Sequence, residues 1–301
     1  MIRIAVICPS DIAERRFLPS LRQNKDFQFV GLGTASPEEW FGDKLSTTPK
    51  EKIDAMRKVQ SIKAKNIINQ YGGRIFDSYH EVISSDDVDT VYIPLPPALH
   101  FKWAKQALEN GKHTFVEKPF TTNLKDTLSL LSIARKKGLA VQENYMLQYH
   151  QQLLDINNII ESGKLGDVRL YRISFGFPLR KLNDFRYNKV LGGGATLDCC
   201  GYTIKYASML LGPTAKVVQA QSNYLEDSSV DIYGSAVMTN ENGFTAQLAF
   251  GMDNSYKCEL AVWGSKACLL TIRVLTAPAA LSPDDVIISS LCHELKFKLP
   301  I

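Results

Sequence analysis

A charged pair followed by proline ends an otherwise apolar stretch near the middle of the chain. Glu117-Lys118-Pro119 comes directly after residues 113–116, whose composition predicts a buried strand. An ammonium group at such a strand end can hydrogen-bond a carbonyl or hydroxyl oxygen and stabilise negative charge that develops there. Because proline follows Lys118, we expect the Lys118–Pro119 peptide bond to be cis. A lone Glu-Lys pair at a strand end is common on protein surfaces, so the triplet needs support from other residues.

Asp198 and Tyr202 form a second polar pair with useful spacing. They are four residues apart in a predicted helix, residues 196–211, and therefore share one face of it. The turn Gly192-Gly193-Gly194 precedes this helix and allows close backbone approach. A phenol near a lysine has a lowered pKa and can exchange a proton with a substrate oxygen. The alternative is a half-buried tyrosine whose hydroxyl is satisfied within the protein.

The loop after the first predicted strand departs from the dinucleotide-binding pattern G-x-G-x-x-G/A. The aligned stretch is Cys8-Pro9-Ser10-Asp11-Ile12-Ala13. Only Ala13 fits, and Pro9 lacks an N–H group. Two interpretations stay open. Either the Ser10 hydroxyl and the helix start at Asp11 and Ile12 still bind a diphosphate, or cofactor affinity is weakened or lost.

The elements that would position these residues change character near residue 150. Before it, short apolar strands alternate with helices, which predicts a Rossmann-like, doubly wound parallel sheet. The predicted strands are residues 2–7, 27–32, 74–76, 90–93, 113–116 and 139–142, and the helices are residues 12–23, 50–71, 78–83, 100–110 and 123–137.

After residue 150 the pattern predicts a large, open, mainly antiparallel sheet. Its strands are residues 168–175, 216–224, 231–240, 244–251, 257–263, 267–273 and 294–299, with helices at 151–162 and 196–211. We therefore expect a Rossmann-like dinucleotide-binding domain over residues 1–122, a return segment over about 123–148, and a substrate-binding and oligomerisation domain over 149–301.

Composition narrows the functional class. The 301 residues are 45% hydrophobic and 22% charged, with a net charge of +4 and no block of like charge, which argues against nucleic acid as a partner. We read no signal peptide in the first residues, and no apolar run approaches the ~20 residues that span a bilayer. The six cysteines form no C-x-x-C pair, so we expect free thiols in the cytoplasm and no metal site.

An ordered set of short motifs resembles the glucose–fructose oxidoreductase and inositol dehydrogenase (Gfo/Idh/MocA) family. The motifs are P-x-x-x-H from Pro96 to His100, Glu117-Lys118-Pro119, Gln142-Glu143-Asn144-Tyr145-Met146, Phe185-Arg186-Tyr187, Gly192-Gly193-Gly194-Ala195, Asp198-x-x-x-Tyr202, Phe250-Gly251-Met252-Asp253-Asn254 and Val262-Trp263-Gly264-Ser265-Lys266. Residues 12–19 and Phe175-Gly176-Phe177-Pro178 are most similar to the branch of NADP-dependent ketoreductases that act on nucleotide-linked deoxysugars.

The resemblance implies roles for individual residues. Lys118 and Tyr202 would be catalytic, and Asp198 would orient Lys118 or the substrate hydroxyls. The implied cofactor contacts are Ser10, Asp11, Ile12, Ser36, Pro94, Leu95, His100, Glu117, Lys118, Asn144 and Arg186. The chain departs from the family pattern where Cys200 replaces a usual glycine, which moves to Gly201.

The end of the second strand bears on the choice of cofactor. Its tail, residues 33–37, holds no acid to accept a ribose 2′-hydroxyl, and the first acidic residue is Glu38. Ser36 keeps half of the Ser-Arg pattern that the family uses for NADP, while Pro37 replaces the arginine. With Arg15, Arg16 or Lys63 as possible cations, we favour NADP(H) over NAD(H).

The resulting hypothesis is an oxidoreductase that transfers a hydride between a nicotinamide and a sugar ring carbon, reducing a keto group of a sugar or nucleotide sugar. Two alternatives stay open: a dihydrodiol- or pentose-type dehydrogenase of a free small substrate, and a non-catalytic sensor or scaffold. The resemblance also implies a homodimer or homotetramer formed through the C-terminal sheet. The usual C-terminal helix is expected to be missing, because the sequence stops at Ile301.

Overall fold

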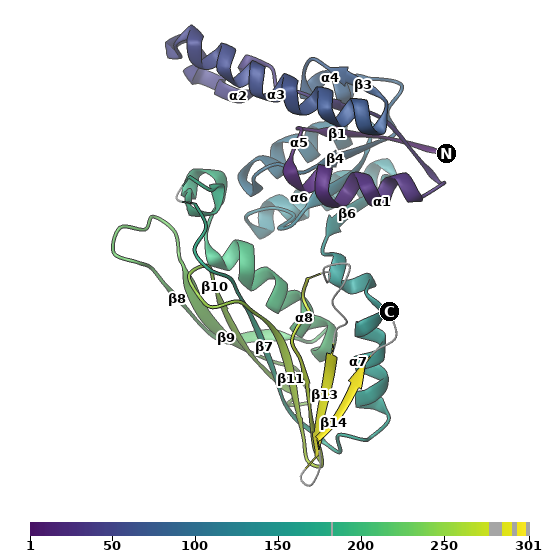
Figure 1. Ribbon diagram of the computed structural model, residues 1–301, viewed down its shortest axis with the longest axis vertical. Helices are drawn as coiled ribbons and strands as arrows, with labels where there is room; N and C mark the ends of the chain where they lie inside the picture. The colour runs from purple at the N-terminus through teal and green to yellow at the C-terminus, as the bar shows by residue number, and fades with distance from the viewer. Residues whose placement is uncertain (182, 277–284, 291–293, 299–301) are drawn as a thin grey trace. The chain divides into compact units, whose positions relative to one another are not determined.

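The computed structural model describes residues 1–181, 183–276, 285–290 and 294–298. The chain divides into two compact units, Met1–Asn144 and Tyr145–Ile301 (Figure 1). The predicted pairing of a Rossmann-like sheet with a second, mainly antiparallel sheet is confirmed. Leu299 and Cys292 lie outside the described residues.

The first unit is built on a six-stranded parallel sheet in the order β3-β2-β1-β4-β5-β6. Its strands are β1 (Ile2–Ile7), β2 (Phe27–Gly33), β3 (Arg74–Phe76), β4 (Thr90–Ile93), β5 (His113–Glu117) and β6 (Val141–Asn144). The helices between them are α1 (Leu18–Gln23), α2 (Pro37–Phe41), α3 (Lys50–Tyr71), α4 (Tyr79–Ser84), α5 (Pro97–Glu109) and α6 (Leu124–Lys137). All strands run the same way, so their carboxyl ends meet at one edge of the sheet.

Helices cover both faces of this sheet. Ala5 and Ile7 of β1 point into one core, which α4, α5 and α6 complete. Ile4 and Val6 point into the opposite core, which α1 and α3 complete. Burial on both faces explains why the strands are nearly continuous apolar runs instead of alternating polar and apolar residues.

Several local elements differ from the sequence prediction. The helix expected over residues 12–23 contains a π-helical turn, Ala13–Phe17, before α1. The sixth strand lies two residues further along than the predicted 139–142, so that Asn144 ends it. Helix α2 was not predicted, although Ser36 and Glu39 form a capping box at its start.

The second unit contains an eight-stranded sheet in the order β14-β13-β12-β11-β7-β10-β9-β8. Its strands are β7 (Val168–Gly176), β8 (Lys216–Asn223), β9 (Tyr233–Thr239), β10 (Thr245–Gly251), β11 (Lys257–Gly264), β12 (Ala267–Thr271), β13 (Asp285–Ser290) and β14 (Glu294–Lys298). Neighbouring strands are antiparallel except β7 and β10, which pair in parallel. The sequence did not predict β13.

One face of this sheet is covered by α7 (Gln151–Glu161) and α8 (Gly201–Leu211). Alternate strand residues such as Ile173, Leu248 and Leu260 pack with Tyr206 of α8 in a single core. Side chains on the other face are more exposed, and β8 is exposed along almost its whole length. This one-sided burial produces the period-two pattern seen in the sequence.

The helix predicted over residues 196–211 is also composite. A π-helical turn, Thr196–Cys200, precedes α8, so Asp198 and Tyr202 belong to different helix types. Single π-helical turns inside helices occur frequently at functional sites. Short 3₁₀ turns at Met146–Tyr149, Phe185–Tyr187 and Lys189–Leu191 complete the unit and were not predicted.

An ion pair ties the start of β1 to the turn before β4. Arg3 donates to both carboxylate oxygens of Asp89, at 3.0 and 2.6 Å. These hydrogen bonds lower the pKa of Asp89 to about 2. An aspartate whose native pKa lies below its unfolded value of about 3.9 stabilises the fold above that pH, and the contribution is lost as the pH falls toward the native pKa.

We therefore expect Asp89→Asn to lower the stability of the first unit at pH 7 and to flatten its decline between about pH 4 and pH 2. Urea unfolding at pH 7 and pH 3 measures both effects, with Asp227→Asn in an exposed loop as the control. An unchanged pH dependence in Asp89→Asn would contradict the role assigned to this ion pair.

Candidate functional site

The side chain of Glu117, at the carboxyl end of β5, is fixed by both neighbouring strands. The Tyr92 hydroxyl on β4 donates to Glu117 Oε1 at 2.6 Å, and the Asn144 amide on β6 donates to the same oxygen. Burial and the Glu117 carboxylate raise the pKa of Tyr92, so its hydroxyl stays a proton donor. Tyr92 is fully buried and stacks on Phe17 at 3.8 Å. Glu117 is therefore held in place as a carboxylate acceptor.

The backbone that follows Lys118 is fixed as well. The amide of Phe120 donates to Glu143 Oε1 at 2.7 Å, and the carbonyl of Pro119 lies 2.7 Å from His100 Nδ1. The Lys118–Pro119 peptide bond is cis, which confirms the expectation from the sequence. Lys118 itself is half-buried. We call residues 117–120 the Lys118 turn.

His100, on α5, is fully buried and contacts two loops at once. Its Nε2 lies 2.7 Å from the carbonyl of Leu95, and its Nδ1 faces Pro119. Burial lowers the pKa of His100, although both backbone contacts oppose this shift. The sequence placed His100 among the cofactor contacts. In the structure both ring nitrogens are directed at the protein's own backbone instead.

The first loop has one backbone feature of a glycine-rich turn although it lacks the glycines. Cys8 has φ of 86°, the left-handed conformation that normally selects glycine. Ser10 Oγ accepts from the Ala13 amide at 3.2 Å, and Asp11 pairs with Lys63 at 2.9 Å. First-turn N–H groups at a helix start have no acceptor within the helix, so those near Asp11 and Ile12 can meet an anion. The residues present fit a diphosphate at this edge.

The end of β2 presents a serine beside a carboxylate. Ser36 Oγ donates to Glu38 Oε2 at 2.8 Å. The carboxylate of Glu39 accepts from the backbone amides of Ser36, Tyr79 and His80, each at 2.9 Å, and is occupied by the protein itself. Two of the basic residues that the sequence offered for a 2′-phosphate bond to Asp11 instead. Lys63 pairs with the Asp11 carboxylate, and Arg15 Nε donates to the Asp11 backbone carbonyl at 3.3 Å.

In the second unit, Asp198 is buried and paired with an arginine. Arg186 Nε lies 2.7 Å from Asp198 Oδ2, and its Nη1 lies 3.1 Å from Asp184 Oδ1. Burial opposes the charge on Arg186, but Asp198 and Asp184 outweigh it and raise the pKa of the guanidinium. The sequence placed Arg186 among the cofactor contacts; in the structure its guanidinium bonds to Asp198 and Asp184.

Tyr202 lies one turn after Asp198 with its side chain enclosed by aromatic rings. It is 7% exposed, and the rings of Tyr145 and Phe175 meet it edge-on at 5.1 and 4.9 Å. Gly201 allows this packing, because a Cβ there would lie 2.2 Å from the Tyr145 hydroxyl. The glycine that departs from the family spacing therefore has a local steric reason.

The adjacent cysteines do not suit redox or metal chemistry. Cys199 and Cys200 are both buried free thiols, and burial raises the pKa of Cys200 to about 11. A thiol that stays protonated is a poor nucleophile and ligand. Among the residues described, no group of three or more His, Cys, Asp or Glu side chains is arranged to hold a metal ion.

Asp231, in the loop before β9, fixes the start of the helix that carries Asp198 and Tyr202. Its Oδ2 accepts from the backbone amide of Thr196 at 2.7 Å and from the hydroxyl at 2.6 Å. Gly194 has φ of 119°, and a Cβ there would come within 2.3 Å of Asp231 Oδ1. The glycine-rich turn is thus required for this carboxylate to approach the helix.

The sequence identified Glu117, Asn144, Asp198 and Tyr202 but missed several residues that hold them. These are Tyr92, Glu143, Asp184 and Asp231. Tyr92 was signalled as a polar group within a buried strand, and Glu143 belongs to a motif already noted. Asp231 carried no signal, because it is close to Thr196 only in the folded chain.

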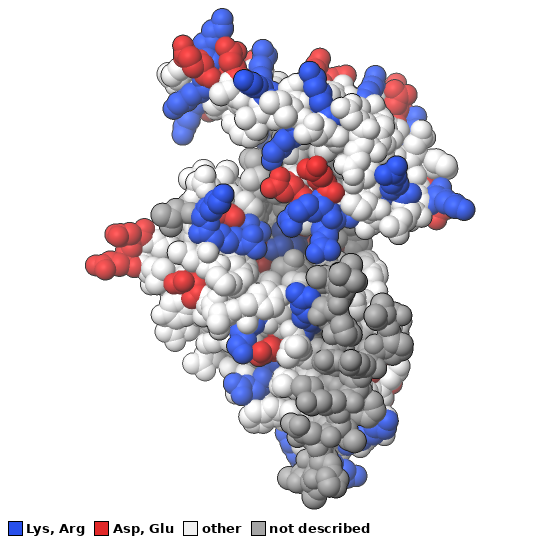
Figure 2. Space-filling model, viewed as in Figure 1, with Lys and Arg blue, Asp and Glu red and all other residues white. Residues whose placement is uncertain are grey.

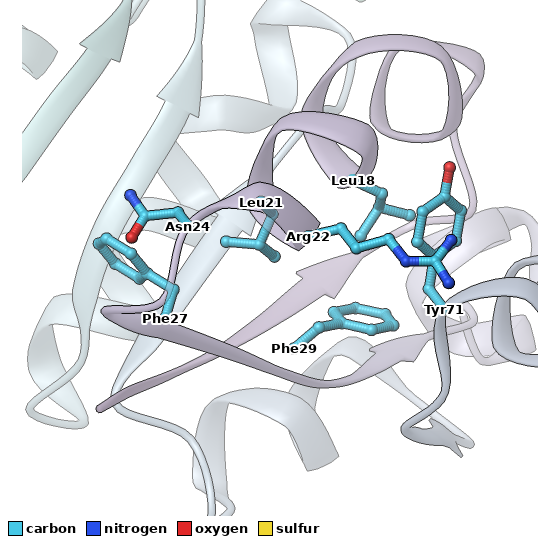
Figure 3. Close-up of a pocket in the computed structure, with 7 residues that line it drawn as sticks. All are labelled: Leu18, Leu21, Arg22, Asn24, Phe27, Phe29 and Tyr71. Atoms are coloured by element: carbon cyan, nitrogen blue, oxygen red, sulfur yellow. The ribbon is translucent and has the colours of Figure 1, made fainter.

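A cavity of about 160 Å³ lies elsewhere in the first unit (Figure 3). It is lined by Leu18, Leu21, Arg22, Asn24, Phe27, Phe29 and Tyr71. Phe27 begins β2, so this cavity lies toward the amino end of that strand and away from the Lys118 turn.

The visible surface of the first unit carries interspersed charges of both signs (Figure 2). Within the described residues, no helix is both long enough and apolar enough to cross a membrane.

The fold combines a parallel sheet of the nucleotide-binding kind with a second, open-sheet unit, and comparison with known families gives its class. Residues 25–145 match a model described as an oxidoreductase family with an NAD-binding Rossmann fold, and residues 153–270 match the GFO/IDH/MocA C-terminal domain.

Known relatives agree with these matches. The chain is 34% identical over 299 residues to dTDP-3,4-didehydro-2,6-dideoxy-alpha-D-glucose 3-reductase of Actinomadura kijaniata, covering 99% of this chain and 82% of the relative. A solved structure of a 3-ketoreductase from that organism, in complex with NADP and TDP-benzene, superposes with a TM-score of 0.87 at 33% identity, covering 99% of this chain and 84% of the other. A D-xylose 1-dehydrogenase (NADP(+)) of Haloferax volcanii is 30% identical over 59% of this chain and 54% of its own.

The chain belongs to the Gfo/Idh/MocA family of oxidoreductases. Membership confirms the resemblance drawn from the motifs and the prediction that the protein is an enzyme of the oxidoreductase class.

The crowding at Gly194 generates a stability prediction. We expect Gly194→Ala to destabilise the second unit more than Gly212→Ala, because both positions have positive φ but only Gly194 faces a carboxylate. A non-glycine residue in such a conformation costs about 1–3 kcal/mol, and the clash with Asp231 adds to that at Gly194. Urea unfolding of the two variants makes the comparison. Equal destabilisation would show that Asp231 does not constrain the turn.

Proposed function

We propose that this protein reduces a keto group on a ring carbon of a nucleotide-linked deoxysugar, with NADP(H) as cofactor. The observation that carries the proposal is the Lys118 turn, where a lysine is held at the carboxyl edge of a nucleotide-binding sheet. The relative's name supplies the substrate class, because the Actinomadura enzyme acts on a dTDP-linked keto-deoxysugar.

The cofactor would lie along the carboxyl edge of the first sheet, where open α/β folds bind nucleotides. Its contacts would come from Ser10, Asp11, Ile12, Ser36, Pro94, Leu95, Glu117, Lys118 and Asn144. The nicotinamide supplies or accepts the hydride. We favour NADP(H) because Ser36 is retained, no aspartate directly ends β2, and the related 3-ketoreductase structure contains NADP.

The protein's own residues would handle the oxygen and the proton. The Lys118 ammonium would bond to the carbonyl oxygen and stabilise the negative charge that develops as the carbon is reduced. The Tyr202 phenol would donate its proton to that oxygen and regain one from solvent. Asp198, paired with Arg186, would orient substrate hydroxyls. The related structures include variants of one lysine and one tyrosine, the same two residue types.

We further propose that the open face of the second sheet mediates contacts between copies of the chain. Tyr233 and Trp263 are exposed aromatic residues at outward-facing positions of β9 and β11. Exposed apolar side chains that gather on one surface favour association.

We expect NADPH to bind the purified protein and to be oxidised when a dTDP-3-keto-deoxysugar is added. Lys118→Ala and Tyr202→Phe should each lower kcat by about 10²–10⁴-fold, since each removes a group that acts in the transition state. Exposed Lys125→Ala and Tyr224→Phe are the matched controls. NADPH fluorescence and absorbance report binding and turnover.

The outcome also separates the alternatives. Faster turnover of NADP⁺ with free D-xylose or a trans-dihydrodiol would favour a dehydrogenase of small free substrates. No turnover of any of these substrates, or turnover that survives Lys118→Ala, would contradict the proposed mechanism.

A further inference from the structure

We infer that His100 is a positioning residue for the proposed reaction: its ring joins the loop after β4 to the Lys118 turn and thereby sets the direction of the Lys118 side chain. The inference rests on the proposed function. It assigns to His100 a task different from the cofactor contact that the sequence suggested.

The geometry shows that His100 acts on backbone from two separate loops. Nε2 and Nδ1 each lie 2.7 Å from a carbonyl oxygen, of Leu95 and of Pro119. Carbonyl oxygens only accept hydrogen bonds, and a neutral imidazole has a single N–H, so the neutral ring donates to one of the two carbonyls at a time, whereas the imidazolium form donates to both. The residue is fully buried, and a buried hydrogen bond broken by mutation leaves an unsatisfied carbonyl that costs about 1–3 kcal/mol.

The contact between His100 and the Pro119 carbonyl can affect the position of Lys118, the proposed catalytic residue. Pro119 follows Lys118 directly and its ring fixes φ, so holding the Pro119 carbonyl restricts the backbone that carries Lys118. Three further contacts hold other atoms of the turn: Tyr92 and Asn144 hold the Glu117 side chain, and Glu143 holds the Phe120 amide. His100 is the residue that holds the carbonyl between Lys118 and Phe120.

The two ring nitrogens can be tested separately with amide side chains. Asn places its amide near the position of Nδ1 and can keep the contact to Pro119. Gln places its amide near the position of Nε2 and can keep the contact to Leu95. Phe fills the ring volume and keeps neither contact.

We expect kcat with NADPH and a dTDP-3-keto-deoxysugar to fall in the order His100, His100→Asn, His100→Gln, His100→Phe. The loss for His100→Phe should be on the order of 10–100-fold, because a small misplacement of a reacting group can cost up to about 10²-fold. The KM for NADPH should rise more in His100→Asn than in His100→Gln, because only Gln can keep the contact to Leu95, one of the proposed cofactor contacts. Asn leaves the largest void, so the order of stability should differ from the order of kcat.

A second measurement needs neither cofactor nor turnover. Hydrogen–deuterium exchange of the full chain should rise in residues 117–123 in His100→Phe and less in His100→Asn, with no change in the β9–β10 hairpin. Trp103→Phe is the control, because Trp103 is buried on the same helix and packs edge-on against Tyr79 at 5.1 Å. It should lower stability without changing exchange in the Lys118 turn.

The inference is overturned if His100→Asn is no more active than His100→Phe, or if kcat follows thermal stability across all four variants. It is also overturned if exchange in the turn is unchanged in His100→Phe. Absence of turnover in the unmodified protein would instead reject the proposed function, and the exchange experiment would still decide the role of His100 in holding the turn.

Discussion

A lysine and a glutamate placed at the end of a buried strand must be held by hydrogen bonds from their surroundings, and this constraint organises the first unit. Glu117 is bonded by Tyr92 and Asn144 from the strands on either side. Pro119 and Phe120 are bonded by His100 and Glu143. These partners come from β4, β6 and α5, so the turn has its shape only when the parallel sheet and its covering helix are assembled. The cost of desolvating charged and polar groups is offset by the bonds that fix them.

In the second unit, Asp198 is likewise a buried charged group that is held by other residues of the unit. A buried carboxylate needs a cation, and Arg186 supplies it while also pairing with Asp184. The start of the same helix is held by Asp231, which reaches Thr196 because Gly194 has no side chain. Tyr202 is enclosed by Tyr145 and Phe175, and Gly201 makes room for Tyr145. Each candidate functional group therefore rests on residues from other parts of its own unit.

Most of the architecture could be predicted from the sequence, because it depends on local patterns. Apolar runs buried on both faces marked β1 and β4, and alternation marked the strands of the second sheet. The position of β6 was wrong by two residues, since Leu139 and Ala140 are also apolar and only tertiary pairing decides the register. The π-helical turns at residues 13–17 and 196–200 carry no local signal, because the same residues also suit an α-helix.

The sequence predicted the candidate site residues that stand in recognisable motifs. It did not predict their hydrogen-bond partners, because these come from distant segments of the chain. Lys118, Asp198 and Tyr202 stand in recognisable spacings. The partners of His100 and Arg186 could not be read from spacing, because they join segments through space: His100 bonds to Leu95 and Pro119, and Arg186 to Asp198. Asp231 lies 35 residues from Thr196 and was missed for the same reason.

The proposed function requires the Lys118 ammonium and the Tyr202 phenol to act on one substrate oxygen. A double-mutant cycle of Lys118→Ala and Tyr202→Phe on kcat/KM, with NADPH and a dTDP-3-keto-deoxysugar, tests it most directly. Groups that act on the same oxygen are coupled, so we expect the double variant to lose much less than the product of the two single losses, with a coupling energy of about 0.5–3 kcal/mol. Losses that multiply would show that the two residues act independently and would contradict the claim.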